Sequence, residues 1–345
     1  MARTVKAEDG VSTRNDVLNL LEIHRGESLS GGDIARQLSV SRNAVWKAVR
    51  ELQKEGHQIE GVTNKGYCLS SESDVISREG IRLYLSNPDR IGGIQVFKTV
   101  DSTNNLAKQM AMAGAPHGTV IIAEAQSSGR GRKGRAFISP AGGGLYTSFL
   151  FRPALDVNQA LITTAAAAVL TARTLESVKD CDITIKWVND VFLQNKKVCG
   201  ILTEAATDWE SGAIDYLIIG IGINVKPSGS GFPPEVDRVA GNLFGPGETA
   251  VLRNRLAALL IDKIFDFFQE LEENPKQAAK SIMAEYRQRS NVLNHRIQIL
   301  GDPSLTEGLA VDIDDQGFLI VEDDQGGRHT LNSGEVSILP DWYQR

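Results

Sequence analysis

The chain of 345 residues contains few cysteines, and their spacing forms no recognisable motif. Cys68, Cys181 and Cys199 are odd in number and far apart, and none belongs to a Cys-x-x-Cys pair. This pattern excludes a disulfide framework and favours reduced thiols in the cytoplasm. The five histidines are scattered, so no zinc-ligand spacing is present, and we expect no metal site made of protein side chains alone.

A long hydrophobic run is also missing. The most apolar stretch, 160–175, is rich in Ala and Thr and is interrupted by Arg173. It is too short and too polar to cross a bilayer, and we expect a buried helix there. The N-terminus is polar and lacks the apolar region of a signal peptide, which favours a cytoplasmic protein with no membrane contact.

Positive charge is not in excess either. The net charge is -6, so the body of the protein is not a nucleic-acid binder, and any such role must be local. The length allows two or three domains. We predict an α+β multidomain chain with boundaries at 1–70, 75–288 and 289–345.

Residues 1–70 are predicted to form a winged helix-turn-helix domain. Helices are expected at 15–24, with Val17, Leu20, Leu21 and Ile23 inward, at 33–38 after a break at Gly31 and Gly32, and after the N-cap residue Ser41. A hairpin over 57–69 follows. The third helix exposes cations and amides, so we predict that Arg42, Asn43, Trp46 and Lys47 face a DNA groove while Arg50 and Lys65 contact phosphates. The alternative is a small helical domain for protein contacts.

Residues 75–288 mix strands and helices. Strands are expected at 95–100, 119–125, 144–151, 182–187, 191–194, 197–204 and 216–225, and an amphipathic helix at 249–274, before Pro275. The inner stripe of that helix is Leu252, Leu256, Leu259, Leu260, Ile264, Phe267, Phe268 and Leu271. Residues 289–345 contain short strands split by Asp/Gly turns, which predicts a small SH3-like β-barrel. Its own residues show no chemistry, and we expect it to pack against the middle domain.

The segment 129–135 reads Gly-Arg-Gly-Arg-Lys-Gly-Arg, with four cations and three glycines. Glycine lets backbone N–H groups approach a ligand closely, and arginine suits phosphate and carboxylate oxygens. The alternatives are a solvated linker or an RNA-binding tail. Because predicted core strands flank the segment, we favour an anion-binding loop held by a scaffold. The spacing excludes a Walker P-loop.

Three further polar features lie in the middle domain. Asp101-Ser-Thr-Asn-Asn105 opens a helix, where its side chains either cap that helix or bind a neutral polar group. Lys186 lies within an apolar strand and is followed by Asn189 and Asp190. A lysine in that position must extend to solvent, pair with an acid or face a site. Gln126 precedes the cationic loop.

Together these segments resemble the biotin protein ligase family, specifically the bifunctional ligase–repressors, over nearly the whole chain. Segment 129–135 is similar to the family's adenylate-binding loop, and Lys186-Trp-Val-Asn-Asp190 to its Lys-Trp-Pro-Asn-Asp signature. Segments 101–104, 197–204 and 220–224 match in order and spacing. Two positions depart from the pattern: Val188 replaces proline and Phe137 replaces tryptophan. We expect Val188 to soften the turn that holds Asn189 and Asp190. Phe137 keeps an aromatic ring but reduces the aromatic surface over the adenine.

The resemblance implies a central mixed-sheet domain of the biotin/lipoate ligase type and a reaction between biotin and ATP, with Mg²⁺ accompanying the nucleotide. Biotinyl-5′-AMP would form and pass its acyl group to a lysine of a biotin carboxyl carrier protein. The implied catalytic residues are Lys186, Arg132 and Asp190. The implied biotin-binding residues are Ser102, Thr103, Asn104, Gln126, Arg130, Gly131, Arg132 and Lys186. The implied adenylate-binding residues are Gly129, Arg130, Gly131, Arg132, Arg135, Phe137, Asn189 and Asn224.

The resemblance also implies a repressor of biotin genes that binds operator DNA as a ligand-promoted homodimer, with the adenylate as corepressor. We expect the cationic loop to order when ligand binds. Three alternatives remain: a ligand-sensing transcription factor without catalysis, a lipoate–protein ligase, and a general RNA-binding protein, which the acidic composition disfavours.

Overall fold

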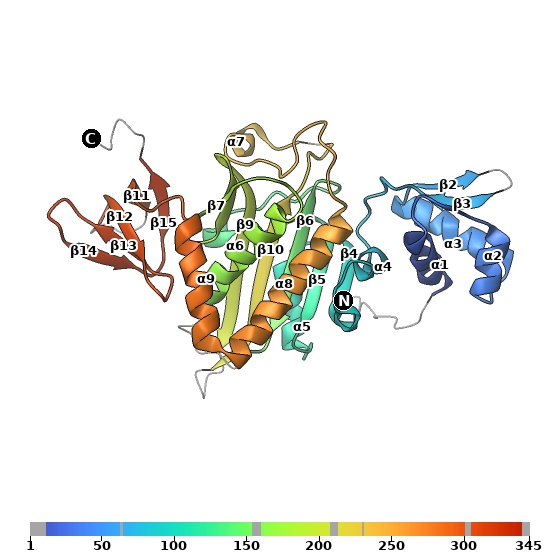
Figure 1. The fold of residues 1–345 in the computed structure, drawn as a ribbon, viewed down its shortest axis with the longest axis horizontal. Helices are drawn as coiled ribbons and strands as arrows, with labels where there is room; N and C mark the ends of the chain where they lie inside the picture. The colour runs from blue at the N-terminus through green and yellow to red at the C-terminus, as the bar shows by residue number, and fades with distance from the viewer. Residues whose placement is uncertain are drawn as a thin grey trace, which may run out of the picture. The chain divides into compact units, whose positions relative to one another are not determined.

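The computed structural model describes residues 12–62, 65–153, 160–207, 213–229, 231–300 and 305–339, without the side chains of 160 and 161 (Figure 1). The chain divides into two compact units, Met1–Tyr84 and Leu85–Arg345. Residues 75–84, which we assigned to the middle domain, therefore fall in the first unit. They include helix α4 (Arg78–Arg82), which packs against α1.

The first unit is a winged helix-turn-helix. Its helices are α1 (Thr13–Ile23), α2 (Gly31–Gln37) and α3 (Arg42–Glu55), and its sheet has the order β1 (Ser28–Leu29), β3 (Gly66–Leu69), β2 (Ile59–Val62). Ser41 caps α3 as predicted. Two predictions were wrong: α2 begins at Gly31 because the Ser30 hydroxyl caps it, and Ile23 is 53% exposed. A cap that satisfies free N–H groups outweighs the low helix propensity of two glycines.

The second unit is built on a seven-stranded sheet in the order β4-β5-β6-β10-β9-β8-β7. Its strands are β4 (Ile94–Val100), β5 (Thr119–Gln126), β6 (Gly144–Phe151), β7 (Ile183–Lys186), β8 (Asp190–Leu193), β9 (Lys196–Thr207) and β10 (Ile214–Asn224). Only β4 and β5 pair in parallel, because helix α5 (Thr103–Met112) makes the crossover between them. The mixed sheet that we predicted is confirmed.

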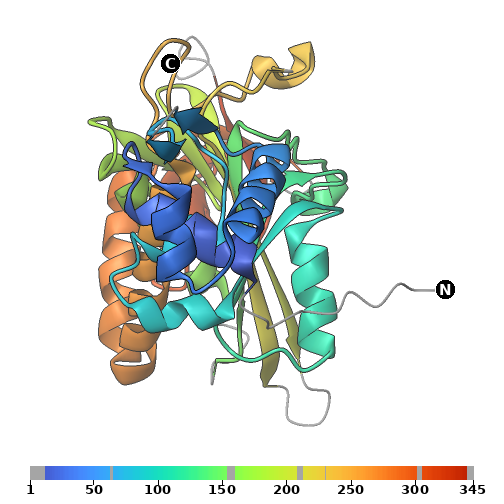
Figure 2. The same ribbon diagram turned by 90° about the vertical axis from the view of Figure 1, so that its right-hand side faces the viewer.

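Helices cover both faces of this sheet, as Figure 2 shows with the sheet between α5 and the orange helices. Helix α5 packs on the face that carries Ile121, Leu150 and Ile218. The opposite face carries α6 (Ala160–Glu176), α8 (Arg253–Glu273) and α9 (Pro275–Arg289). There the rings of Phe151 and Phe268 stack at 3.8 Å.

Helix α8 confirms most of the predicted apolar stripe, although Leu252 precedes it and Leu259 is only half-buried. We did not predict α9, which Pro275 starts as its first residue, a position where the missing proline N–H is not needed. The short helices η1 (Pro88–Gly93), η2 (Arg132–Gly134) and α7 (Pro234–Asp237) complete the helical elements. Within the described ranges, no helix has the length and apolarity needed to cross a membrane.

The C-terminal residues form an antiparallel sheet in the order β14-β13-β12-β11-β15. Its strands are β11 (Arg296–Leu300), β12 (Glu307–Ile313), β13 (Leu319–Glu322), β14 (Arg328–Leu331) and β15 (Glu335–Ile338). Among the described residues no pairing joins β14 to β15, so the predicted barrel is an open sheet. The Trp187 indole N–H donates to the Gly317 carbonyl at 3.0 Å, which fastens this sheet to the strand that carries Lys186.

Candidate active site

One row of residues runs across five strands of the large sheet at matched register. Tyr146 pairs with Gly222, Gly222 with Gly200, Gly200 with Asp190, and Asp190 with Lys186. The register therefore brings the signature residues 186–190 into line with the glycines of segments 197–204 and 220–224.

The glycines of this row leave room for side chains that lie flat on the sheet. A Cβ atom at Gly222 would lie 2.6 Å from the Phe137 ring, and one at Gly200 would lie 3.1 Å from it. At Gly220 a Cβ atom would lie 2.1 Å from Asn104 Oδ1. These glycines are needed for the close approach of Phe137 and Asn104, which lie directly on the backbone of the sheet.

The cationic loop is a folded turn. Gly131 N–H donates to Arg135 O at 2.7 Å, and Phe137 N–H donates to Gly129 O at 2.8 Å. Lys133 and Gly134 have φ values of 53° and 74°, which close the turn. A Cβ atom at Gly129 would lie 2.3 Å from the Phe137 carbonyl oxygen, so this glycine supports the loop backbone. The expected scaffold is present.

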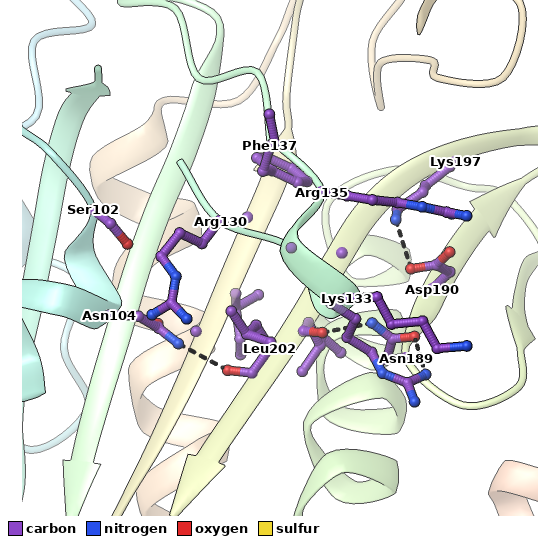
Figure 3. Close-up of a pocket in the computed structure, with 18 of the residues that line it drawn as sticks. Ser102, Asn104, Arg130, Lys133, Arg135, Phe137, Asn189, Asp190, Lys197 and Leu202 are labelled. Carbon is purple, nitrogen blue, oxygen red and sulfur yellow. Dashed lines mark hydrogen bonds and ion pairs between the residues drawn. The ribbon is translucent and has the colours of Figure 1, made fainter. Parts of the chain in front are cut away.

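A cavity of about 150 Å³ lies between the loop and the sheet (Figure 3). Ser102 and Asn104 lie on one side and Asp190 and Lys197 on the other, with Arg130 between them. The predicted residues that line it are Ser102, Thr103, Asn104, Gln126, Arg130, Gly131, Arg132, Arg135, Phe137, Lys186, Asn189 and Asp190. The structure thus brings together twelve residues from four separate sequence segments.

The cations around this cavity differ in whether a carboxylate neutralises them. Arg130 lies 3.1 Å from Glu204, and Lys197 lies 2.6 Å from Asp190. Lys186 is half-buried and has no ion-pair or hydrogen-bond partner for its ammonium among the described residues, and Arg132 contacts only the amide oxygen of Asn189, at 3.3 Å. In the part of the chain that the structure describes, Lys186 and Arg132 are therefore half-buried cations without a carboxylate partner, while Lys133, also without one, is exposed; an anion binds favourably near the two half-buried groups.

The opposite side of the cavity is neutral and polar. Gln126 Oε1 accepts from Thr103 N–H at 2.8 Å, and Gln126 Nε2 donates to Ser139 Oγ at 2.8 Å. Ser102 caps α5, so the capping alternative holds while the residue also lines the cavity. These groups offer donors and acceptors without net charge.

Asn104 is engaged mainly with the protein itself. Its Nδ2 donates to Leu202 O at 3.1 Å and to Glu204 Oε2 at 2.8 Å, while its Oδ1 accepts from Ser148 at 2.7 Å. Both amide hydrogens are used in this way. The residue lines the cavity, and its contacts fix α5 against the sheet.

Two hydrogen bonds hold the turn that carries Val188. Tyr286 donates its hydroxyl proton to Val188 O at 2.9 Å, and Asn189 Nδ2 donates to Ile201 O at 2.7 Å. Burial raises the pKa of Tyr286, so its phenol stays a neutral donor. The turn is held in place without the proline that the resemblance led us to expect.

Asn224 lies apart from the other predicted residues. It lines a second cavity with Tyr146, Gly143, Lys226 and Ser228, and Tyr146 lines both cavities. Gly129 is not among the lining residues of either. The predicted adenylate site is thus divided between two neighbouring cavities that share one ring.

Among the charged residues that line the cavity, sequence reasoning missed Lys133, Lys197 and Glu335, and it also missed Glu204, which pairs with Arg130. Lys197 and Glu204 belong to a segment that we matched to the family without giving it a role. Glu335 lies in the C-terminal sheet, where we expected no chemistry, yet Gly334, Glu335 and Val336 line the first cavity. No local pattern marks such a long-range contact.

The predicted DNA-contacting residues lie on the surface of the first unit. Arg42, Asn43, Trp46, Lys47 and Arg50 are exposed on α3, and Lys65 is exposed between β2 and β3. Trp46 is 51% exposed, and the Arg50 guanidinium lies 6.0 Å from its ring centroid. The face keeps the cationic character that the sequence indicated.

The described residues contain no group of three or more His, Cys, Asp or Glu side chains arranged to hold a metal ion. Asp190, the nearest candidate, is paired with Lys197. Its carboxylate is already compensated.

Comparisons with known proteins agree with this architecture. Three family models match: the biotin/lipoate A/B protein ligase family at 96–224, an HTH domain at 13–68 and the biotin protein ligase C-terminal domain at 292–339. The bifunctional ligase/repressor BirA of Bacillus spizizenii is 31% identical over 91% of this chain and 95% of its own length. That of Escherichia coli is 28% identical over 90% of this chain and 95% of its own.

Among solved structures, the biotin protein ligase from Aquifex aeolicus in complex with biotin and ATP is similar, with 26% identity and a TM-score of 0.60. The match covers 72% of this chain and 99% of that one. Since the match to the Bacillus relative spans all three regions, the chain belongs to the bifunctional ligase/repressor family of biotin protein ligases.

Proposed function

We propose that this protein activates biotin with ATP and transfers it to a lysine of a carrier protein. The biotin carboxylate attacks the α-phosphorus of ATP, which forms biotinyl-5′-AMP and releases pyrophosphate. A lysine amine of the carrier then attacks the acyl carbon, which releases AMP. The observation that carries the proposal is the unpaired Lys186 ammonium in a cavity that Arg132 also lines and that has a neutral polar end.

The first step brings two anions together, so it needs fixed positive charge where negative charge accumulates. Lys186 and Arg132 supply that charge. Ser102, Thr103 and Gln126 suit the uncharged ureido ring at the other end. We assign Arg130 to holding the loop against Glu204 and Asn105, since its guanidinium contacts both.

We place the adenosine towards the second cavity, where Asn224 lies and which Tyr146 connects to the first. Phe137, which packs over Gly200 and Gly222, lies between the two ends of the adenylate. The magnesium ion enters with ATP as part of the substrate. Asp190 acts through Lys197, its ion-pair partner, in this scheme.

Biotin-dependent exchange of labelled pyrophosphate into ATP tests the ligase reaction. We expect exchange with biotin and much less with lipoate. No exchange at high protein concentration would leave a ligand sensor without catalysis, and a preference for lipoate would identify the other ligase class. Transfer is tested with the biotin carboxyl carrier domain of an acetyl-CoA carboxylase.

We further propose that the first unit represses biotin genes in the cytoplasm, where the three free thiols stay reduced. The exposed cationic face of α3 supports DNA binding, and a homodimer promoted by the adenylate would span two half-sites. A gel-shift assay on the upstream region of the biotin genes, with and without biotin and ATP, tests this role. DNA binding that is the same with and without biotin and ATP would contradict this role.

A further inference from the structure

We propose that Glu124 and Arg253 form a positioning pair for the nucleotide. In this proposal the pair fixes the wall of the second cavity and so sets the affinity for ATP separately from the affinity for biotin. The inference rests on the proposed function, because it takes the second cavity as the adenosine site.

The arginine of the pair is almost fully enclosed, and the Glu124 side chain is 20% exposed. Arg253, the first residue of α8, is 2% exposed, and its Nη2 lies 3.0 Å from Glu124 Oε1 on β5. Taking an arginine out of water is costly unless its donors are used in good geometry. One Arg253 donor reaches a backbone carbonyl, Gly144 O, at 2.9 Å.

The two charged groups hold the same turn from both sides. Gly142 N–H donates to Glu124 Oε1 at 2.7 Å, two residues before the carbonyl that Arg253 binds. The turn 142–144 is therefore fixed to β5 through the acid and to α8 through the base. No apolar replacement provides both a donor and an acceptor at these positions.

The turn 142–144 in turn holds the wall of the second cavity. Gly143 O accepts from Val225 N–H and from Lys226 N–H, each at 2.9 Å. A Cβ atom at Gly143 would lie 2.9 Å from both Lys226 O and the Ser228 side chain. Gly143, Lys226 and Ser228 all line the second cavity.

The position of Tyr146, which lines both cavities, depends on the same turn. A Cβ atom at Gly144 would lie 2.3 Å from the Tyr146 hydroxyl, so the phenol packs directly on this glycine. The Tyr146 hydroxyl donates to Pro140 O at 3.0 Å, and burial raises its pKa, which keeps it a neutral donor. A shift of the turn would move the ring and the 225–228 segment together. At the biotin end, the hydrogen bond from Thr103 N–H to Gln126 Oε1 involves no residue of the turn.

The test compares KM for ATP and KM for biotin in adenylate formation by Arg253→Lys, Arg253→Met and Glu124→Gln in the full chain. We expect Arg253→Met and Glu124→Gln to raise KM for ATP by about tenfold or more while KM for biotin changes less than about twofold. Arg253→Lys should recover part of the ATP affinity, because it keeps the charge. Should Arg253→Met fail to fold, the other two variants decide the question.

Asp262→Asn is the matched control. Asp262 also lies on α8 in a largely buried ion pair, 2.5 Å from Arg90, but it fastens the helix to η1 and contacts neither cavity. This variant should lower the melting temperature and leave both KM values unchanged. Equal changes in both KM values for the Arg253 and Glu124 variants, or no change in either, would overturn the inference. A wild-type protein that forms no adenylate would instead overturn the proposed function, and the inference with it.

Discussion

Arg135 and Glu335 form a bidentate ion pair, with both N···O distances at 2.7 Å, across 200 residues of sequence. One partner ends the cationic loop and the other begins β15 of the C-terminal sheet. The pair ties the loop to a sheet that sequence reasoning treated as a packing module. The C-terminal residues are therefore part of the closure of the site.

Glu335→Gln should release the end of the loop. Because the Arg135 side chain is 66% exposed, we expect little effect on stability, about 0–1 kcal/mol, and a several-fold faster loss of bound adenylate. Stopped-flow release of biotinyl-5′-AMP measures this rate. Asp324→Asn, which breaks an ion pair with Arg296 in the same sheet, is the control and should leave release unchanged.

Lys186→Met removes the unpaired ammonium while keeping most of the side-chain volume. Adenylate formation should fall by roughly 100-fold or more, the effect of deleting a group that stabilises developing charge. DNA binding by protein preloaded with synthetic adenylate should stay close to wild type. Equal losses in both assays would indicate misfolding.

Arg132→Gly removes a guanidinium whose one side-chain hydrogen bond within the described part of the chain goes to the Asn189 amide oxygen. We expect the adenylate to leak to solvent, so that carrier-independent AMP production rises. Carrier-independent AMP production by Arg132→Lys should lie between that of Arg132→Gly and that of the wild type, because a point charge lacks the planar fork of arginine. A residence time equal to that of the wild type would exclude this role.

Gly222→Ala places a methyl group where only 2.6 Å separates it from the Phe137 ring. The ring must move, at a cost of about 1–3 kcal/mol in adenylate binding, as for other overpacked sites. In a Phe137→Ala background the same substitution should cost far less, which a double-mutant cycle measures. Gly92→Ala, where a Cβ atom meets open space, should have no effect on binding.

His57 makes the first unit sensitive to acid. Burial, with Arg25 and Arg14 nearby, lowers its pKa to about 4, below the ordinary 6.5. The unfolded chain therefore binds a proton that the folded unit rejects, and stability falls by up to about 3 kcal/mol as the pH drops from 6.5 to 4. Burial raises the pKa values of Glu22 and Glu79, which has the opposite effect.

Comparison with His57→Leu isolates the histidine contribution. Hydrogen exchange of α3 amides in the full chain, measured for both proteins at each pH, reports the stability of this unit. Relative to the variant, the wild type should lose protection towards pH 4. A constant difference across this range would contradict the assignment.

Elements with strong local patterns were predicted well. The helix that follows Ser41 and the apolar run of β10 both lie where the sequence placed them. Capping and proline decided the failures, since Ser30 starts α2 at a glycine and Pro275 starts α9. In both cases the signal was present in the sequence, but we read it as the end of a helix or as a break, where the structure has the start of a helix.

The sequence predicted which residues belong to the site, but it did not predict how they are arranged. Motif order indicated that Lys186, Arg132 and Gln126 belong together, and all three line one cavity. Strand register decides that Asp190 faces Gly200, and tertiary packing decides that Glu335 reaches Arg135. Neither follows from spacing, because both depend on contacts between distant segments.

The strip formed by Gly200, Gly220 and Gly222 has a consequence for inhibition. A compound that packs against Phe137 and Asn104 depends on the positions that these glycines allow the two side chains to take. A side chain added to the strip displaces Phe137 or Asn104. A mutant that escapes such a compound would therefore damage its own site, which makes the strip a durable target for drug design.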